Sequence, residues 1–188
     1  MSSPGPERSE FHFRAIGIVH SPFHEPAQTP IQPVFAADVR GQVEVFPQYA
    51  EGLKDLEGFS HLHLIYVFDR VTEMKLRVKP YLQDVEHGIF ATRSPTRPNP
   101  IGMSIVRLIG RDGGTLHVQE LDILDGTPLL DIKPFSPRFD LRAEARAGWM
   151  EQVDEATAWQ RGRRAGRNPD QCYAVEEYSR DAYCSACS

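Results

Sequence analysis

Short apolar segments separated by glycine and proline turns recur through the first 140 residues, and this pattern limits the folds open to the chain. The run SHLHLIYVF, residues 60–68, alternates strictly, with Leu62, Leu64 and Tyr66 on one face. Such alternation is typical of a half-buried strand. The pattern therefore predicts a mainly β (α+β) domain, a barrel or a sandwich. Similar runs occupy residues 41–46, 103–112, 115–124 and 128–135.

The N-terminal part predicts one more strand, a long loop and a short helix. The strand covers residues 11–21, and prolines at positions 22, 26, 30 and 33 make the following loop extended and semi-rigid. Long loops in compact domains are often functional. Leu53, Leu56 and Phe59 have helical spacing and predict one or two helical turns. No glycine-rich fingerprint joins a strand to a helix, so the sequence does not support a Rossmann nucleotide site.

The chain changes character after residue 140. Residues 141–160 are rich in Ala, Glu and Arg and predict a helix whose Trp149 could face the domain. We therefore expect a flexible N-terminus at 1–10, a β domain at 11–140, and a helical extension with a tail at 141–188.

Charge and apolar patterning narrow the possible locations and partners. The net charge of −5 excludes a bulk attraction to nucleic acid, so any polyanion site must be a local patch. No signal-peptide core and no run approaching about 20 apolar residues is present, which predicts a cytoplasmic protein with no membrane partner. Cys172, Cys184 and Cys187 all lie near the C-terminus and are expected to be reduced thiols rather than a disulfide framework.

Two further patterns could carry chemistry. His61 and His63 share one face of a strand, as ligands of barrel metal sites do, but hydrogen-bonded structural histidines are the more common case. The second pattern is a group of arginines after the predicted helix, which is either a phosphate-contacting patch or a solvated helix end. Its members are Arg161, Arg163, Arg164 and Arg167.

The stretch FATRSPTRPNP, residues 90–100, contains three prolines and two arginines. Proline fixes φ and biases the preceding residue toward extended backbone, so Arg97 and Asn99 are held in defined directions. Little entropy remains to be lost on binding, which suits a ligand loop. A second constrained turn begins at Asp125-Gly126. A hairpin would explain this glycine, but not Asp122, Asp125 and Asp131 within ten residues.

Four stretches together resemble the TsaA/TrmO-like family of S-adenosylmethionine-dependent tRNA methyltransferases. They are AIGIVHSPF with PIQP at residues 15–33, GFSHLHLIYVF at 58–68, GIFATRSPTRPNPIGMSIVRL at 88–108 and LDILDGTPLLDIKPF at 121–135. The resemblance covers about residues 11–140, with the motifs in the family's order. It implies a compact β-barrel, unlike Rossmann-type methyltransferases, that forms a homodimer with the cofactor near the subunit interface. The implied reaction is N6-methylation of N6-threonylcarbamoyladenosine at position 37, in the tRNA anticodon loop.

The resemblance also implies cofactor contacts. Carried over position by position, they are Pro33, Val34, Phe35, Asp69, Arg70, Arg93, Met103, Leu124, Asp125, Gly126 and Thr127. An arginine fork such as Arg93 suits the carboxylate of S-adenosylmethionine, and an acid such as Asp69 or Asp125 suits its ammonium group or ribose. No metal is implied.

Roles toward the substrate follow from chemistry and analogy. By analogy with Asn-Pro motifs in unrelated adenine N6-methyltransferases, Asn99 and Pro100 could orient the attacking N6 through an amide oxygen and a backbone carbonyl. The cations Arg97 and Arg161, Arg163, Arg164 and Arg167 are candidates for contact with tRNA phosphates. No DNA partner is implied.

Some members of the family carry a larger C-terminal domain that helps to recognise tRNA, and the segment after residue 140 is unlike it. The set of tRNA substrates therefore stays open. Two alternatives from other classes also remain at this point: a cupin-like metal enzyme that uses His61 and His63, and a non-catalytic RNA-binding barrel.

Overall fold

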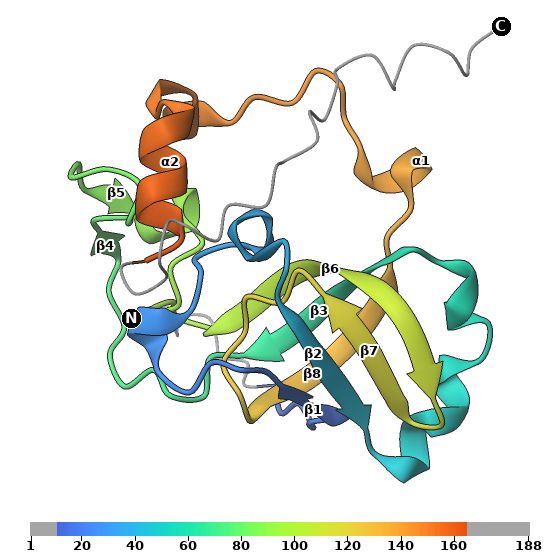
Figure 1. The fold of residues 1–188 in the computed structure, drawn as a ribbon. Coiled ribbons are helices and arrows are strands. Elements are labelled where there is room, and N and C mark those ends of the chain that lie inside the picture. Colours follow the sequence, from blue (N-terminus) through green and yellow to red (C-terminus); the bar gives the residue numbers. More distant parts are fainter. Residues whose placement is uncertain (1–10, 165–188) are drawn as a thin grey trace, which may run out of the picture.

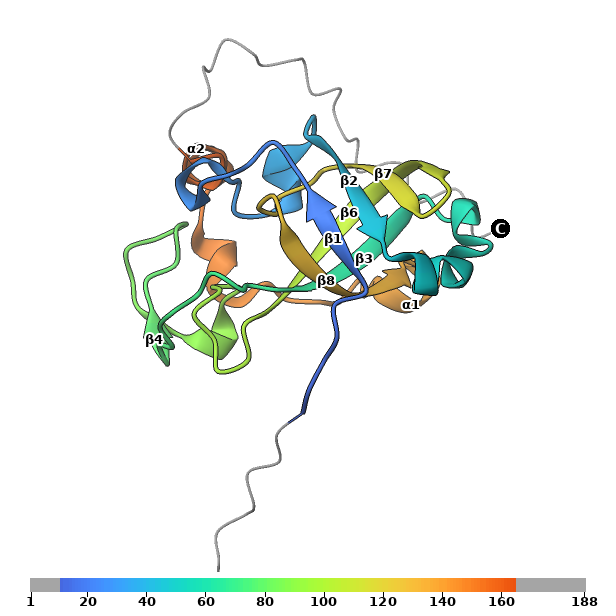
Figure 2. The same ribbon diagram turned by 90° about the horizontal axis from the view of Figure 1, so that it is seen from below.

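The computed structural model describes residues 11–164, and its centre is a closed antiparallel β-barrel (Figure 1). The prediction of a mainly β domain is confirmed, with the barrel as the form adopted. Neighbouring strands run in the order β1-β2-β7-β6-β3-β8, and β8 pairs with β1 to close the barrel (Figure 2). The barrel strands are β1 (Gly17–His20), β2 (Arg40–Val45), β3 (His61–Val67), β6 (Ile101–Asp112), β7 (Thr115–Gln119) and β8 (Thr127–Pro134).

The barrel interior is filled by the side chains that the alternating pattern points inward. On β3 these are Leu62, Leu64 and Tyr66, all buried as predicted. Strands β6 and β7 contribute Val106 and Val118, each at most 1% exposed. Because every second residue of each strand faces this core, the strand register fixes which side chains reach it.

All three connections at one end of the barrel are the ones that carry motif residues. Since neighbouring strands are antiparallel, the last residues of β1, β3 and β7 lie beside the first residues of β2, β6 and β8. Connections 21–39, 68–100 and 120–126 therefore leave from the same end, which we call the loop end. Two small strands, β4 (Arg77–Val78) and β5 (His87–Gly88), form a separate pair within the second connection.

The helices within residues 11–164 are short, lie in the connections and after β8, and form no layer of their own. The α-helices are α1 (Pro137–Asp140) and α2 (Glu155–Gly162); α1 follows β8 at the end opposite the loop end, whereas α2 returns to the loop end (Figure 1). The 3-10 helices are Pro26–Gln28, Pro33–Ala36, Pro47–Leu53, Leu56–Gly58, Ile89–Ala91 and Gly148–Gln152.

The C-terminal segment is less helical than its composition predicts. A continuous helix over 141–160 is wrong: only Gly148–Gln152 and α2 are helical there. Gly148 has φ +62°, outside the helical region, and the Asp154 side chain caps α2 by accepting from the Thr157 amide. The first strand is also shorter than predicted, and β7 ends at Gln119 because Glu120 has φ +67°.

Within residues 11–164 we find no helix with the length and apolar character to cross a membrane. The expectations for the N-terminus at 1–10, for Arg167, and for Cys172, Cys184 and Cys187 lie outside the described residues.

Candidate functional site

The loop end brings together the residues that the sequence motifs single out. Each predicted cofactor contact lies in one of its three connections or at the adjoining ends of β6 and β8. Met103, the third residue of β6, is 47% exposed and pairs with Ile65 on the outside of the barrel. The topology therefore places segments more than 90 residues apart in sequence at one end of one barrel.

The turn at Asp125 and Gly126 is tied to the first connection by several hydrogen bonds. The Asp125 amide donates to the Phe23 carbonyl at 2.7 Å, and the Asp125 carboxylate accepts from the Ser21 amide at 3.0 Å. Gly126 has φ +78°, a left-handed conformation that favours glycine, and its amide donates to Val19. The turn is thus fixed in shape before any ligand binds.

Arg70 links the second connection to the same turn. Its guanidinium donates to the Asp125 carbonyl at 2.5 Å and to the His24 carbonyl at 3.3 Å. His20 and His24 approach the Asp125 carboxylate at 3.9 Å and 3.7 Å. Two predicted contacts, Arg70 and Asp125, are therefore in direct contact with each other, while Asp69 beside them is exposed.

Arg93 joins the second connection to the proline loop. Its guanidinium is exposed and donates to the Gln32 side-chain oxygen at 2.6 Å. Gln32 directly precedes the 3-10 helix that carries Pro33, Val34 and Phe35. Val34 is 59% exposed, whereas the Phe35 ring packs edge-on against Trp159 of α2 at 5.4 Å.

A buried polar chain lies at the inner side of this site. Ser104 donates to the Asp122 carboxylate at 2.6 Å, and the Tyr66 hydroxyl lies 3.1 Å from the Ser104 oxygen. Burial raises the pKa of Asp122 to about 7, although Ser104, the backbone and the positive charge of Arg93 act in the opposite direction. Burial, with the charge of Asp122, raises the pKa of Tyr66. The pKa of the Asp122 carboxyl therefore lies near neutral pH.

The sequence alone did not identify the hydrogen-bonded side chains Tyr66, Ser104 and Asp122 as a functional group. Ser104 occupies an inward position of β6 between Gly102 and Val106, where an apolar residue is expected. A lone hydroxyl at an inward strand position requires a buried partner, and that was the available signal. Asp122 stood out only as one of three nearby acids.

The proline-rich stretch uses some of its polar groups internally. Arg97 donates to the carbonyls of Thr92 and Ile89 at 2.7 and 3.2 Å and lies over the Phe90 ring, so its guanidinium supports its own loop. The Pro100 carbonyl accepts from the Phe68 amide at 2.7 Å, which leaves one oxygen lone pair for another donor. The Asn99 side chain is exposed.

The arginines at the end of α2 also lie at the loop end. Arg161 forms a two-point pair with Asp84, Arg163 stacks on Trp159, and Arg164 lies over the Tyr81 ring. The Ile31 amide donates to the Gly162 carbonyl at 3.0 Å, which fixes the end of α2 against the proline loop.

The two histidines considered as metal ligands have other neighbours. The His61 ring lies 2.9 Å from the Ser60 hydroxyl, and His63 lies 3.6 Å from the Asp140 carboxylate. Across residues 11–164, no three His, Cys, Asp or Glu side chains are grouped so that they could hold a metal ion.

Known proteins are similar to the chain over this region. The family model described as tRNA-methyltransferase O N-terminal domain matches residues 18–141. A "Probable S-adenosyl-L-methionine-binding protein" of Pyrococcus abyssi is 57% identical over 140 residues, which cover 74% of this chain and 76% of that protein. The Escherichia coli tRNA (adenine(37)-N6)-methyltransferase is 37% identical over 158 residues, covering 79% of this chain and 67% of that protein.

The likeness extends to solved structures. A crystal structure of TrmO matches with a TM-score of 0.65 and 41% sequence identity, covering 74% of this chain and 64% of that chain. The chain thus spans less than two thirds of the solved TrmO protein. The residues that the family model matches, 18–141, contain the barrel strands β2 to β8 and the three connections of the loop end.

Proposed function

The chain belongs to the tRNA-methyltransferase O family, and we propose on this premise that it is an S-adenosylmethionine-dependent methyltransferase. Its substrate is tRNA, and its reaction is methylation of N6 of threonylcarbamoyladenosine at position 37 in the anticodon loop. The observation that supports the proposal best is the meeting of Arg93, Arg70 and the Asp125 turn at one end of the barrel. We expect the enzyme to act in the cytoplasm.

The residues at the loop end fit the chemistry of S-adenosylmethionine. Arg93 offers a planar cation, already oriented by Gln32, for the cofactor carboxylate. The fixed turn at 124–127 offers backbone groups for adenine or ribose, with glycine at the position where the backbone needs a positive φ. Apolar contact comes from Val34 and Met103, which are exposed in the protein alone. When bound, the cofactor supplies an electrophilic methyl group.

The chain's own contribution to the reaction is placement. Methyl transfer is an in-line displacement, and its rate depends mainly on holding the two reacting atoms aligned at about 3 to 3.5 Å. The attacking N6 is a weak nucleophile because its lone pair is delocalised, so hydrogen-bond acceptors that orient its N–H group increase the rate. Asn99 supplies such an acceptor from an exposed position, and the remaining lone pair of the Pro100 carbonyl is the second.

The tRNA approaches the loop end through local positive charge, despite the net charge of −5. An anticodon-loop purine is unpaired, so the enzyme reaches N6 without opening a duplex. Arg161, Arg163 and Arg164 are the described candidates for phosphate contact at this end. Arg97 is a weaker candidate because its guanidinium is engaged by Thr92 and Ile89.

We expect the enzyme to act as a homodimer. Exposed apolar side chains at and beside the loop end support this, among them Phe90 at 76%, Met103 at 47% and Ile101 at 40% exposure. A second copy would cover such side chains and bring its own loops to the cofactor. Sedimentation with and without S-adenosylhomocysteine measures this directly.

Mass spectrometry of tRNA nucleosides tests the reaction. The purified chain, with S-adenosylmethionine and tRNA containing threonylcarbamoyladenosine, should add one methyl group to that nucleoside. The Asn99→Ala variant should slow single-turnover transfer about tenfold or more at saturating cofactor and tRNA. Calorimetry with S-adenosylhomocysteine separates the methyltransferase from a non-catalytic RNA-binding barrel, which would bind RNA but no cofactor.

If threonylcarbamoyladenosine stays unmethylated under these conditions, the proposed reaction is wrong. The alternative of a metal enzyme built on His61 and His63 is not favoured, because within residues 11–164 these histidines belong to no group of three possible metal ligands, and the relatives are named as methyltransferases.

A further inference from the structure

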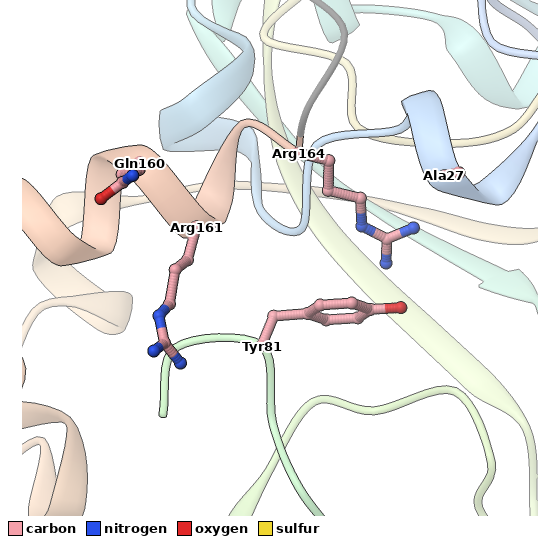
Figure 3. Close-up of a pocket in the computed structure, with 5 residues that line it drawn as sticks. All are labelled: Ala27, Tyr81, Gln160, Arg161 and Arg164. Carbon is pink, nitrogen blue, oxygen red and sulfur yellow. The ribbon is translucent and has the colours of Figure 1, made fainter. Parts of the chain in front are cut away.

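A pocket of about 480 Å³ lies at the loop end between α2, the Pro26–Gln28 helix and the loop that carries Tyr81 (Figure 3). Its lining consists of Ala27, Tyr81, Gln160, Arg161 and Arg164, and we call it the α2 pocket. Tyr81 is 58% exposed although its ring is a large apolar surface. The resemblance to the methyltransferase family assigns no role to Tyr81 or to this pocket.

The central feature of the α2 pocket is an aromatic ring covered by a cation. The Arg164 guanidinium lies 4.1 Å from the centre of the Tyr81 ring, and Figure 3 shows it above the ring plane. The same guanidinium donates to the Pro26 carbonyl. These two contacts hold the ring and the charge in one arrangement, so little conformational freedom would be lost when a ligand binds.

The arrangement is obtained at a local cost. Arg164 has φ +56°, a left-handed conformation that is unfavourable for a residue other than glycine. Its Nε atom is buried and has no hydrogen-bond partner. Strain and unpaired polar groups of this kind often mark sites where the surrounding structure serves a function.

Arg161 forms the other wall of the pocket. Its guanidinium contacts both carboxylate oxygens of Asp84, at 3.0 and 3.3 Å, and this contact lowers the pKa of Asp84. The Asp84 side chain is 87% exposed. The Arg161 guanidinium is thus oriented to bind an anion through two N–H groups, and a phosphate can replace the exposed Asp84 carboxylate there.

The α2 pocket adjoins the predicted cofactor loops through one short segment. Arg70 donates to the His24 carbonyl, and Arg164 donates to the Pro26 carbonyl two residues later. Arg70 in turn holds the Asp125 turn. A polynucleotide that delivers one purine to the methyl group of a cofactor held at this turn therefore has the α2 pocket within reach of its neighbouring nucleotides.

We propose that the α2 pocket binds one unpaired nucleotide of the tRNA, with its base stacked against the Tyr81–Arg164 pair and its phosphate at Arg161. Aromatic and guanidinium planes are the surfaces on which proteins stack unpaired RNA bases, and a neighbouring arginine supplies the phosphate contact. The inference rests on the proposed function because it takes tRNA as the substrate.

Binding of an anticodon stem-loop RNA to the full chain tests this inference by fluorescence anisotropy. The Tyr81→Ala variant should bind about tenfold more weakly, because one stacking surface is lost. Tyr81→Phe keeps the ring and should bind nearly as well as the unmodified chain. Phe139→Ala removes a similarly exposed ring from α1, at the opposite end of the barrel, and is the matched control. Equal binding by Tyr81→Ala and Phe139→Ala overturns the inference.

A second measurement places the nucleotide directly. Stem-loops with 4-thiouridine at single loop positions should crosslink to the peptide that contains Tyr81 or to the one that ends at Arg164. Crosslinks found only elsewhere on the chain refute the pocket assignment. For Arg161→Ala, which removes the proposed phosphate contact, the slope of log affinity against log salt should fall by about 0.7, the value for one phosphate contact on single-stranded nucleic acid.

The two proposals fail in different ways. If the unmodified chain binds no S-adenosylhomocysteine and methylates no tRNA, the proposed function is wrong. If it methylates tRNA and Tyr81→Ala shows an unchanged KM for tRNA, the function stands and the α2 pocket is not a nucleotide site.

Discussion

Ser104 donates a 2.6 Å hydrogen bond to the carboxylate of Asp122 in the protein interior. Asp122 lies two residues before the turn that begins at Leu124. Ser104 is 1% exposed and Asp122 is 8% exposed. A buried carboxyl with one hydroxyl partner is more easily protonated than a solvated one. The charge at this position of the core, next to the candidate cofactor site, therefore depends on the pH.

The stability of the protein should depend on the ionisation of Asp122. Burial raises its folded pKa to about 7 from an ordinary value of 3.8, so the native state holds this proton more tightly than the unfolded chain does. The stabilising contribution of this proton to the free energy of unfolding is fully present below about pH 4 and is lost as the pH rises through about 7. Relative to the unmodified chain, Asp122→Asn should gain on the order of 4 kcal/mol across this window, because it never buries a charge.

Chemical denaturation at several pH values measures the difference between the two chains, and titrations common to both cancel. Asp131→Asn, which alters a partly exposed acid paired with Lys133, is the control and should follow the unmodified chain. Parallel stability curves for Asp122→Asn and the unmodified chain would show that Asp122 is not titrating in this range.

Cofactor affinity should depend on the planar fork of Arg93. A two-point contact between guanidinium and carboxylate is lost when lysine replaces arginine, although the charge remains. Arg93→Lys should weaken S-adenosylhomocysteine binding about tenfold, and Arg93→Ala should weaken it further. Calorimetry gives both values.

Arg77→Ala is the matched control for charge, since Arg77 is 72% exposed and pairs with Glu86 on the small β4–β5 sheet. An equal loss of affinity in Arg77→Ala and Arg93→Ala would mean that general charge, rather than a specific contact, governs binding.

The sequence predicted the barrel and its motifs better than it predicted the contacts within the loops. Alternation in β3 directly reports which side chains face the core, so Leu62 and Leu64 were identified without a structure. Helical composition at 141–160 was misleading, because the positive φ of Gly148 and the Asp154 cap divide that segment. Both interruptions had a local signal, since glycine disfavours a helix interior and aspartate favours a helix start, but a judgement from the composition of the whole segment overlooks it.

Long-range contacts explain the rest of the difference. Arg97 looked available for RNA because a charged residue between prolines reads as exposed, yet carbonyls five and eight residues earlier accept its hydrogen bonds. Tyr81 was not selected, because its partner Arg164 lies more than 80 residues away. Only the closure of the barrel and the return of α2 bring such residues together.

The inner face of β6 should tolerate no side chain at Gly102. A Cβ atom there would lie 2.2 Å from the Tyr66 ring, which would displace the hydroxyl that contacts Ser104. Gly102→Ala should therefore destabilise the fold by about 1–3 kcal/mol, the usual cost of overpacking a core. Urea denaturation of the purified variant measures this loss.

Gly110 supplies the comparison on the same strand. A Cβ atom at Gly110 meets nothing within 4 Å, so Gly110→Ala should change stability far less than Gly102→Ala. Because both changes have the same intrinsic effect on an extended chain, the difference between them isolates the contact with Tyr66. Similar stabilities of the two variants would contradict the close approach of Gly102 to the Tyr66 ring.

The docking of α2 onto the loop end should depend on Gly162. A Cβ atom at this position would lie 2.5 Å from the Phe35 ring, and the Gly162 carbonyl accepts the Ile31 amide. Gly162→Ala should therefore push the end of α2 away from the proline loop while the barrel stays folded. Hydrogen exchange should show faster exchange at the Ile31 amide, with no change at core amides such as Val106. Since the same movement separates Arg164 from Tyr81, binding of the anticodon stem-loop should weaken together with this exchange, and unchanged exchange at Ile31 would refute the contact.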